Sequence, residues 1–374
     1  MNRSTIPTAV SICLAVLLTV GLFGPVAASA APPSGSAIPT GFRAQSLTWV
    51  GPKQGWMLGD APCGTSTCTT VVGTTDGGGT WNTLGTLNAP LTLEEETGVT
   101  ELRFADALHG WAFWPAFWAT KDGGVTWTKQ RPPGGGRQVK ALAGDSDGVY
   151  SLVSLCRLNH PCNDPSTLWR TTAGTGSWTK VSVTLPVVTT AVLAVHGVVA
   201  YLAVPAGFAL SADVLDVTVD GQQWSSRPDP CRPSQDETLV DVAPISDTKV
   251  ALLCVGNPGF SKADKRVLRS NDTGQTTSPA GSTPRDGIVS SLAVAPNGTL
   301  AVESWSDGSW IYRNGGGQSW TTSVSLGDLG EGWNDILFTT NKVGWIIHGP
   351  AASPWLPGEL WGTQDGGVTW GPAL

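Results

Sequence analysis

The chain has 374 residues, a formal net charge of −7 and only 14% charged residues, and its lysines and arginines form no cluster. This acidic balance argues against a nucleic-acid partner and against an anionic membrane surface. The 47 glycines and 18 tryptophans, beside two methionines, favour short strands joined by tight turns over helices.

The first 30 residues predict a secretory signal peptide. Arg3 supplies the positive start, residues 9–23 form an apolar stretch, and Ala28-Ser29-Ala30 is a small-x-small cleavage site. The apolar stretch is shorter than the ~20 residues that a membrane-spanning helix needs, so cleavage is favoured over anchoring. We therefore expect an exported monomer that is not inserted in the membrane. Residues 31–40 are rich in Pro and Ser and predict an extended linker.

Six cysteines follow the predicted cleavage site, and an even number in an exported chain indicates disulfide bonds. Proximity in the sequence favours the pairs Cys63–Cys68, Cys156–Cys162 and Cys231–Cys254 among the 15 possible connectivities. A zinc site is disfavoured because CxxC spacing and paired histidines are missing. We expect no metal ion and no cofactor.

A string of the form Thr-x-Asp-x-Gly-x-Thr-Trp occurs at residues 74–81, 120–127 and 363–370. Four degenerate copies lie between them. The copy at 171–178 has Ala173 in the Asp position, the copy at 218–224 is one residue short, the copy at 270–277 ends in Thr277, and the copy at 313–320 has Gly315 in the Asp position. The conserved positions of the string are Asp76, Trp81, Asp122, Trp127, Trp178, Asp220, Trp224, Asp272, Trp320, Asp365 and Trp370. Their spacing of about 48 residues predicts seven structural repeats.

Each repeat contains four short apolar runs separated by turn residues. In the second repeat, Leu102–Phe104 precedes the Gly110-Trp111 pair, a third run leads into the string, and a fourth begins at its Trp. Four strands per repeat predict an all-β, seven-bladed β-propeller of four-stranded antiparallel blades over residues 41–374. The last repeat leaves only residues 371–374 for an outer strand, so the N-terminal segment is a candidate to complete that blade.

The string itself predicts a turn between the third and fourth strands. Its Asp accepts backbone N–H groups, its Gly takes backbone angles that other residues avoid, and its Trp packs between blades. Carboxylates dispersed one to a blade cannot form a single catalytic site. We therefore interpret the string as structural.

This string matches the Asp-box, or BNR, repeat. Residues 41–374 resemble the propellers of sialidases, of photosystem II assembly and stability factors, and of sortilin-type receptors. The combination of a Gly-Trp pair with TxDGGxTW is most similar to the assembly-factor type, which also occurs as exported proteins of unknown role in non-photosynthetic bacteria. The Phe42-Arg43 opening followed by Cys-x₄-Cys is similar to secreted actinobacterial proteins of this kind.

The sialidase resemblance implies three arginines around a substrate carboxylate, a Tyr nucleophile with a Glu partner, and an Asp acid. Residues 42–45 read Phe-Arg-Ala-Gln and match only half of that family's Phe/Tyr-Arg-Ile-Pro marker. Tyr150 and Tyr201 fall in apolar runs and are expected to be packed, and Tyr312 directly precedes a turn. Sialidase propellers also have six blades, so sialidase activity is disfavoured.

The face opposite the turns carries the other candidates for chemistry. Glu94–Glu96 fall in its loops, and Glu101, Asp241 and Asp335 fall on inner strands that line a channel. A glycoside hydrolase needs two carboxylates that face each other, and the sequence does not pair any two of these. For the glutamate run, a solvated loop is the simpler interpretation.

The same face receives the predicted disulfides and several tryptophans, and two interpretations of those tryptophans stay open. They form an exposed recognition surface, or they fill gaps between blades. Trp114 and Trp118, which flank Pro115, are the first choice for exposed contacts. The candidate ligand-binding residues are Arg103, Trp114, Trp118, Trp305, Trp333 and Trp355. We interpret the chain as a non-catalytic propeller that binds a protein or a cell-envelope glycan through this face; the alternative is a sialidase-like glycoside hydrolase.

Overall fold

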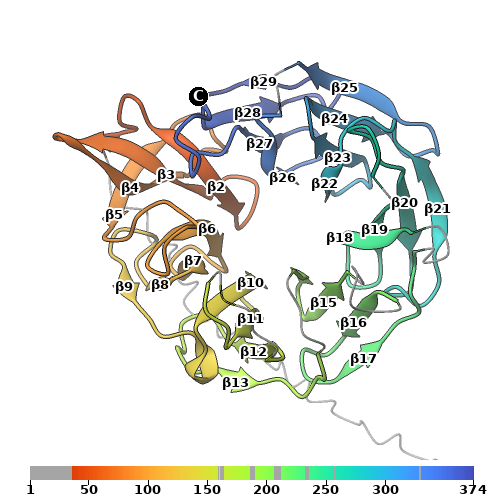
Figure 1. Cartoon of the computed structure of the whole chain (residues 1–374), viewed down its shortest axis with the longest axis horizontal. Helices are drawn as coiled ribbons and strands as arrows, with labels where there is room; N and C mark the ends of the chain where they lie inside the picture. The colour runs from red at the N-terminus through yellow and green to blue at the C-terminus, as the bar shows by residue number, and fades with distance from the viewer. Residues whose placement is uncertain are drawn as a thin grey trace, which may run out of the picture. The chain divides into compact units, whose positions relative to one another are not determined.

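The computed structural model describes residues 36–158, 160, 164–185, 190–205, 212–231, 236–256, 258–327 and 330–374. The predicted signal peptide lies outside these residues. Those described form seven antiparallel sheets arranged around a ring, with the first strand of each sheet innermost (Figure 1). The prediction of a seven-bladed propeller is confirmed. The one helical turn in the described residues is a 3₁₀ turn at Pro133–Gly135.

Four strands of each blade follow one another in chain order from the ring centre outwards. Blade 1 contains β2 (Arg43–Trp49), β3 (Gly55–Cys63), β4 (Ser66–Thr74) and β5 (Asn82–Leu87), and blade 2 contains β6 (Val99–Phe104), β7 (Gly110–Pro115), β8 (Phe117–Thr120) and β9 (Thr128–Lys129). Blade 3 contains β10 (Gln138–Gly144), β11 (Val149–Ser154), β12 (Thr167–Thr171) and β13 (Thr179–Lys180). Blade 4 contains β14 (Val192–His196), β15 (Val199–Val204), β16 (Val214–Thr218) and β17 (Trp224–Ser226).

The remaining three blades repeat this plan. Blade 5 contains β18 (Thr238–Pro244), β19 (Val250–Val255), β20 (Lys265–Ser270) and β21 (Ser278–Ser282). Blade 6 contains β22 (Val289–Val294), β23 (Leu300–Trp305), β24 (Ser309–Asn314) and β25 (Thr321–Leu326). Blade 7 contains β26 (Trp333–Phe338), β27 (Gly344–His348), β28 (Glu359–Thr363) and β29 (Gly371–Pro372).

The N-terminal segment does not complete blade 7, so that expectation is wrong. Strand β1 (Ser36–Ala37) pairs with β5 and gives blade 1 a fifth, outermost strand. Part of the predicted linker is therefore a paired strand. The physical reason is that β29 already supplies the outer strand of blade 7, whereas the outer edge of β5 offers free backbone groups to a passing chain.

The core consists of apolar clusters between neighbouring blades. Trp56, Leu58 and Val71 of blade 1, for example, pack against Leu102 and Phe104 of blade 2. An equivalent cluster fills each of the other junctions. Each blade therefore buries its two faces only against its neighbours, and the apolar burial that stabilises the fold is spread around the ring.

The Gly-Trp pairs at the start of second strands have a steric cause. A Cβ added at Gly55 would lie 2.5 Å from the ring of Trp49, and one at Gly110 would lie 2.7 Å from the ring of Phe104. Glycine thus leaves room for the aromatic side chain that ends the preceding inner strand. The Trp that follows each of these glycines is buried between blades. The Gly-Trp pair is therefore explained by close packing between strands and between blades.

The turns between third and fourth strands have the predicted geometry. Asp76 Oδ1 accepts the Thr80 N–H at 2.9 Å, and its Oδ2 accepts the Thr80 hydroxyl at 2.7 Å. The carboxylates of Asp122, Asp272 and Asp365 make the same two contacts. In the short turn, Asp220 accepts the N–H groups of Gln222 and Gln223. Trp81 is buried, and the other marker tryptophans, which are Trp127, Trp178, Trp224, Trp320 and Trp370, are partly buried in the clusters between blades.

Replacing Asp76 with alanine is expected to lower the free energy of unfolding by about 1–2 kcal/mol, because the Thr74 and Thr80 groups lose their shared acceptor. The hydrogen bonds from Thr80 also lower the pKa of Asp76 to about 2, so its contribution is present above pH 4 and is lost as the pH falls towards 2. Thr75→Ala, in the same turn but exposed, is the control and should change stability little. Urea unfolding at pH 7 checks both variants, and equal stabilities would contradict the assigned role.

Candidate functional site

Two faces of the ring differ in what they carry. The loops between second and third strands and the links between blades lie on one face, here called the loop face, whereas the Thr-x-Asp turns lie on the other. The loop face contains the disulfides Cys63–Cys68 and Cys231–Cys254, with Cα–Cα distances of 5.8 and 5.6 Å. Both predicted pairs are confirmed. The pair Cys156–Cys162 stays a prediction because Cys162 lies outside the described residues.

The tryptophans predicted for the loop face divide into buried and exposed residues. Trp118 and Trp333 are only 8% and 4% exposed, so the expectation that Trp118 makes exposed contacts is wrong. Trp118 packs in the cluster between blades 1 and 2, because its side of β8 faces blade 1. Trp114 and Trp305 are partly buried against neighbouring blades. Trp355 is 89% exposed and is the one residue of the set that presents its ring to solvent.

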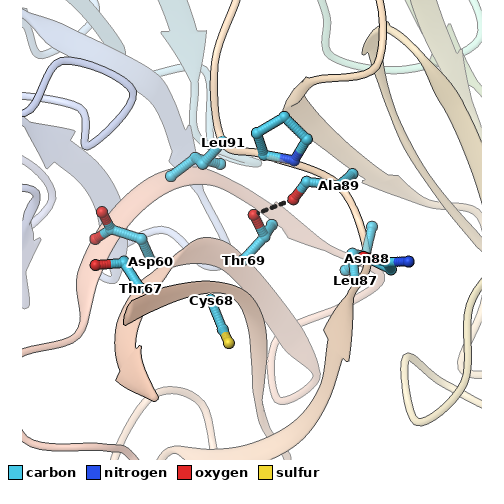
Figure 2. A pocket seen from close by; sticks show the side chains of 9 residues that line it. Asp60, Thr67, Cys68, Thr69, Leu87, Asn88, Ala89 and Leu91 are labelled. Atoms are coloured by element: carbon cyan, nitrogen blue, oxygen red, sulfur yellow. Dashed lines mark hydrogen bonds between the residues drawn. The ribbon is translucent and has the colours of Figure 1, made fainter. Parts of the chain in front are cut away.

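Trp355 stands at the edge of a groove with a volume of about 760 Å³. The groove lies between the loop 350–356 of blade 7, the start of β2, and the link 91–94 that leads to blade 2. A second hollow of about 420 Å³ shares Asp60 and Leu91 with it. Figure 2 shows this second hollow, in which the Thr69 hydroxyl donates to the Ala89 carbonyl at 2.5 Å beside Leu91. The two hollows therefore adjoin each other.

Arg43 fixes the loop that carries Trp355. Its Nε and Nη2 donate to the carboxylate of Asp60, and its Nη1 donates to the carbonyls of Pro354 and Leu356, both at 3.1 Å. The guanidinium therefore ties blade 1 to the loop of blade 7 on both sides of Trp355. The sequence does not predict that Arg43 fixes this loop, because Pro354 and Leu356 lie 311 and 313 positions away from it.

Gln45 presents an amide donor to the groove. Its Oε1 accepts the Ala352 N–H at 2.6 Å, which sets the orientation of the amide and leaves Nε2 on the other side. The side chain is 6% exposed, and among the described residues no hydrogen bond engages Nε2. A nearly buried amide N–H₂ that lines a groove is suited to donate to a carbonyl oxygen of a bound molecule.

The central channel contains the carboxylates considered for hydrolysis. Arg103 Nη2 lies 2.8 Å from Asp335 Oδ1 and 3.3 Å from Glu101 Oε2, so the two carboxyl groups are neighbours. Asp335 Oδ2 also accepts the Leu47 N–H at 2.8 Å and the Ser46 hydroxyl at 2.6 Å. Both oxygens of Asp335 are therefore engaged in joining blades 7, 1 and 2. This geometry makes Arg103 a ring-closing residue and leaves neither oxygen of Asp335 unengaged.

Burial raises the pKa of three carboxyls, two on innermost strands (Glu101 and Asp241) and one on the second strand of blade 6 (Glu303). Desolvation, with the nearby Asp335, raises the pKa of Glu101 to about 8. Desolvation also raises the pKa of Asp241 to about 6, although the N–H groups of Leu292 and Val242 oppose that shift. The pKa of Glu303 rises to about 8 for the same reason. These shifts follow from burial between blades.

The other predicted site residues lie in structural positions. Tyr150 and Tyr201 are fully buried, as expected, and Tyr312 is buried as well, so none of the three is accessible as a nucleophile. Among the described residues, one group of potential metal ligands comes together, namely Asp213, Asp229 and Cys231. Cys231 is already bonded to Cys254, and Asp213 accepts from Thr238 and Leu239, so this group is explained without an ion.

The fold and the groove define the chain as a β-propeller with an exposed site at the junction of its first and last blades. No family model and no curated protein sequence matches the chain. Among solved structures it is similar to YCF48 bound to D1 peptide, with 18% identity, a TM-score of 0.50, and coverage of 88% of this chain and 93% of the other. It is also similar to the propeller domain of the Trilobed protease from Pyrococcus furiosus, which has an open velcro topology (10% identity, TM-score 0.52, coverage 90% and 97%).

A third similar structure comes from an analysis of two prolyl endopeptidases, with 11% identity and a TM-score of 0.56. The match covers 88% of this chain and 49% of that enzyme. At these identities the likeness shows the fold alone, and this fold hosts both binding proteins and parts of enzymes. The described part of the chain contains no helix with the length and apolarity of a membrane span.

Proposed function

We propose that the chain is an exported, non-catalytic propeller of Asp-box repeats that binds an extended peptide segment of another protein in the groove between blades 1 and 7. The observation that carries the proposal is Trp355, which is almost fully exposed yet held in place by the Arg43 contacts to Pro354 and Leu356. Because the backbone on both sides of Trp355 is fixed, the loop loses little entropy when a ligand binds, and an exposed Trp is a typical anchor of a recognition surface.

Two further features support a peptide as the ligand. The Gln45 amide faces the groove and can donate to a main-chain carbonyl. The two adjoining hollows give room for a segment of several residues beside Trp355. YCF48, one of the similar folds, was solved with a peptide bound. The two disulfides fit an oxidising compartment, in keeping with the predicted export.

The alternative of a glycoside hydrolase receives less support. The Glu101 and Asp335 carboxyls are close enough for a catalytic pair, but the hydrogen bonds from blades 1 and 2 engage Asp335. A carboxylate that joins blades is a poor choice for proton transfer, because its protonation would weaken the ring closure.

Trp355→Ala is expected to weaken peptide binding by at least about 30-fold, the size of a hot-spot loss of 2 kcal/mol. A phage-displayed library of random 12-residue peptides selects ligands for the wild-type protein, and their affinities are then measured for each variant. Phe260→Ala is the matched control, since Phe260 is also a fully exposed aromatic of the loop face but lies on blade 5. Peptides that bind Trp355→Ala as well as the wild type would overturn the site. Enrichment on a glycan array with none from the peptide library would overturn the ligand class.

A further inference from the structure

The groove has an acidic edge. Glu94 lines it, and Glu95 and Glu96 continue the same exposed link between blades 1 and 2. Among the described residues no ion pair engages any of these three carboxylates. Within the described part of the chain, their side chains take part in one hydrogen bond, which the Thr97 hydroxyl donates to Glu95 Oε2 at 3.3 Å. The edge therefore carries up to three negative charges that nothing in the described chain offsets.

The positive charge inside the groove does not offset this edge. Arg43 is the one cation that lines the groove, and its guanidinium is held by Asp60 and by two carbonyls of the Trp355 loop. Four of its five N–H donors are in use, so it offers at most one to an anionic ligand. Arg43 and Asp60 also cancel as charges, which leaves Glu94 and its neighbours to set the sign of the groove's potential.

Trp355 also favours a positively charged ligand, as the acidic edge does. The face of an indole ring carries partial negative charge and attracts a Lys ammonium or an Arg guanidinium, and more strongly when the site is desolvated. Trp355 and Glu94 line one groove, so a single basic side chain placed between them would meet an aromatic face and a carboxylate together. The Gln45 amide would meanwhile hold the neighbouring main-chain carbonyl.

From this arrangement we propose that the groove between blades 1 and 7 selects a basic segment, in which a lysine or arginine contacts Trp355 and the Glu94–Glu96 edge. This inference rests on the proposed peptide-binding function and states its specificity. An acidic segment is disfavoured because like charges would face each other across the edge. The overall net charge of −7 steers basic partners towards the protein as a whole, and the groove then positions them.

Three synthetic peptides test the selection. Each has 12 residues of one Gly/Ser/Pro sequence, and they differ only in carrying lysine, glutamine or glutamate at the same three positions. Binding is measured by fluorescence anisotropy of labelled peptide at low salt. We expect the lysine peptide to bind at least about tenfold tighter than the glutamine peptide, with an advantage that shrinks as the salt concentration rises, and the glutamate peptide to bind most weakly.

A pair of charge-matched variants separates the groove from the general charge of the protein. Glu94→Gln with Glu96→Gln should weaken lysine-peptide binding by about 3–10-fold. Asp147→Asn with Asp247→Asn removes the same charge from exposed turns on the opposite face and should change it by less than about twofold. Trp355→Phe should retain most of the affinity that Trp355→Ala loses, since it keeps an aromatic face.

The outcomes distinguish this inference from the proposed function. Equal losses in the two charge-matched variants would mean that the lysine peptide senses only net charge, and the inference would be wrong. If all three peptides bind equally and lose affinity in Trp355→Ala, the groove binds peptides without a preference for basic residues, so the proposed function stands and its specificity fails. If none binds and the random library yields no ligand, both fail.

Discussion

Replacing Asp335 with alanine is expected to lower the free energy of unfolding by about 3 kcal/mol, because one side chain joins three blades. The substitution removes the acceptor of the Leu47 N–H and the Ser46 hydroxyl in blade 1, and it leaves the Arg103 guanidinium of blade 2 without its closest carboxylate. Each group then stays desolvated without its partner. Asp335 also has a positive φ of 56°, which alanine tolerates less well than Asp or Asn.

The reason for this large effect is the way in which the ring closes. Among the described residues no strand passes between blades 1 and 7, and each of these blades is built from one continuous segment. The junction instead depends on two backbone hydrogen bonds of Ala44, with Gly358 at 2.7 Å and with Ala351 at 3.0 Å, and on side-chain contacts. These contacts include the stacked rings of Trp49 and Trp345, with centroids 5.8 Å apart, and the bonds of Asp335. Losing one of these contacts therefore weakens the point where the chain's two ends meet.

Urea unfolding of the wild type, Asp335→Ala and Asp335→Asn measures the effect. Asparagine keeps an oxygen acceptor and the tolerated backbone angle, so it should fall between the other two. Asp307→Ala is the control, because Asp307 is an exposed carboxylate of the same face. A second substitution, Arg103→Met, should restore part of the stability that Asp335→Ala loses, since it removes the orphaned charge. If the double variant loses more free energy of unfolding than the two single variants lose together, the ring-closing role of Asp335 is contradicted.

The repeat was predictable from the sequence because its turn chemistry recurs at a fixed period. Asp76, Asp122 and Asp365 each hold a local turn, and local hydrogen bonds leave a signature within eight residues. The ring-closing role of Arg103 was not predictable in this way. It depends on Asp335, which lies 232 positions away, and no local pattern reports such a pairing.

The contacts that form the groove are also invisible to local sequence patterns. Arg43 contacts Pro354 and Leu356 only because the ring brings the two ends of the chain together, so its role follows from closure and not from its neighbours in the sequence. For the tryptophans, a signal was present. Trp118 lies two residues before Thr120 within a third strand, where alternation places it on a buried face, whereas Trp355 lies among prolines in a loop. Whether a tryptophan lies in a predicted strand or in a loop therefore predicts its exposure better than the face of the ring on which it falls.

Glu303→Gln is expected to stabilise the protein at pH 8 and to have little effect at pH 5. Glu303 is 3% exposed, its Oε1 accepts the Ser291 hydroxyl at 2.6 Å, and its Oε2 is buried without a hydrogen-bond partner. Desolvation, together with the charge of Asp241, raises the pKa of Glu303 from 4.5 to about 8. The folded protein therefore keeps a proton that the unfolded chain releases.

The sign of the pH dependence follows directly. Below pH 4.5 both states hold the proton, and between pH 4.5 and 8 the unfolded state binds fewer protons than the folded state, so stability falls as the pH rises. The slope is about 1.4 kcal/mol per pH unit for one such group, so the gain from glutamine at pH 8 is on the order of 4 kcal/mol. Glu101 and Asp241, whose pKa values are also raised, act in the same direction.

The pH window separates this effect from that of the turns. Asp76, Asp272 and Asp365 have a pKa lowered to about 2, so they contribute to stability above pH 4 and lose that contribution only at lower pH. A comparison between pH 5 and pH 8 therefore excludes the turn aspartates, and the difference between wild type and Glu303→Gln then isolates Glu303 from the other groups that titrate in this window. Unfolding of wild type, Glu303→Gln and the exposed control Glu94→Gln at the two pH values tests the prediction. A constant loss of stability in Glu303→Gln at both pH values would contradict the prediction, because it would mean that the pKa of Glu303 is not raised in the folded protein.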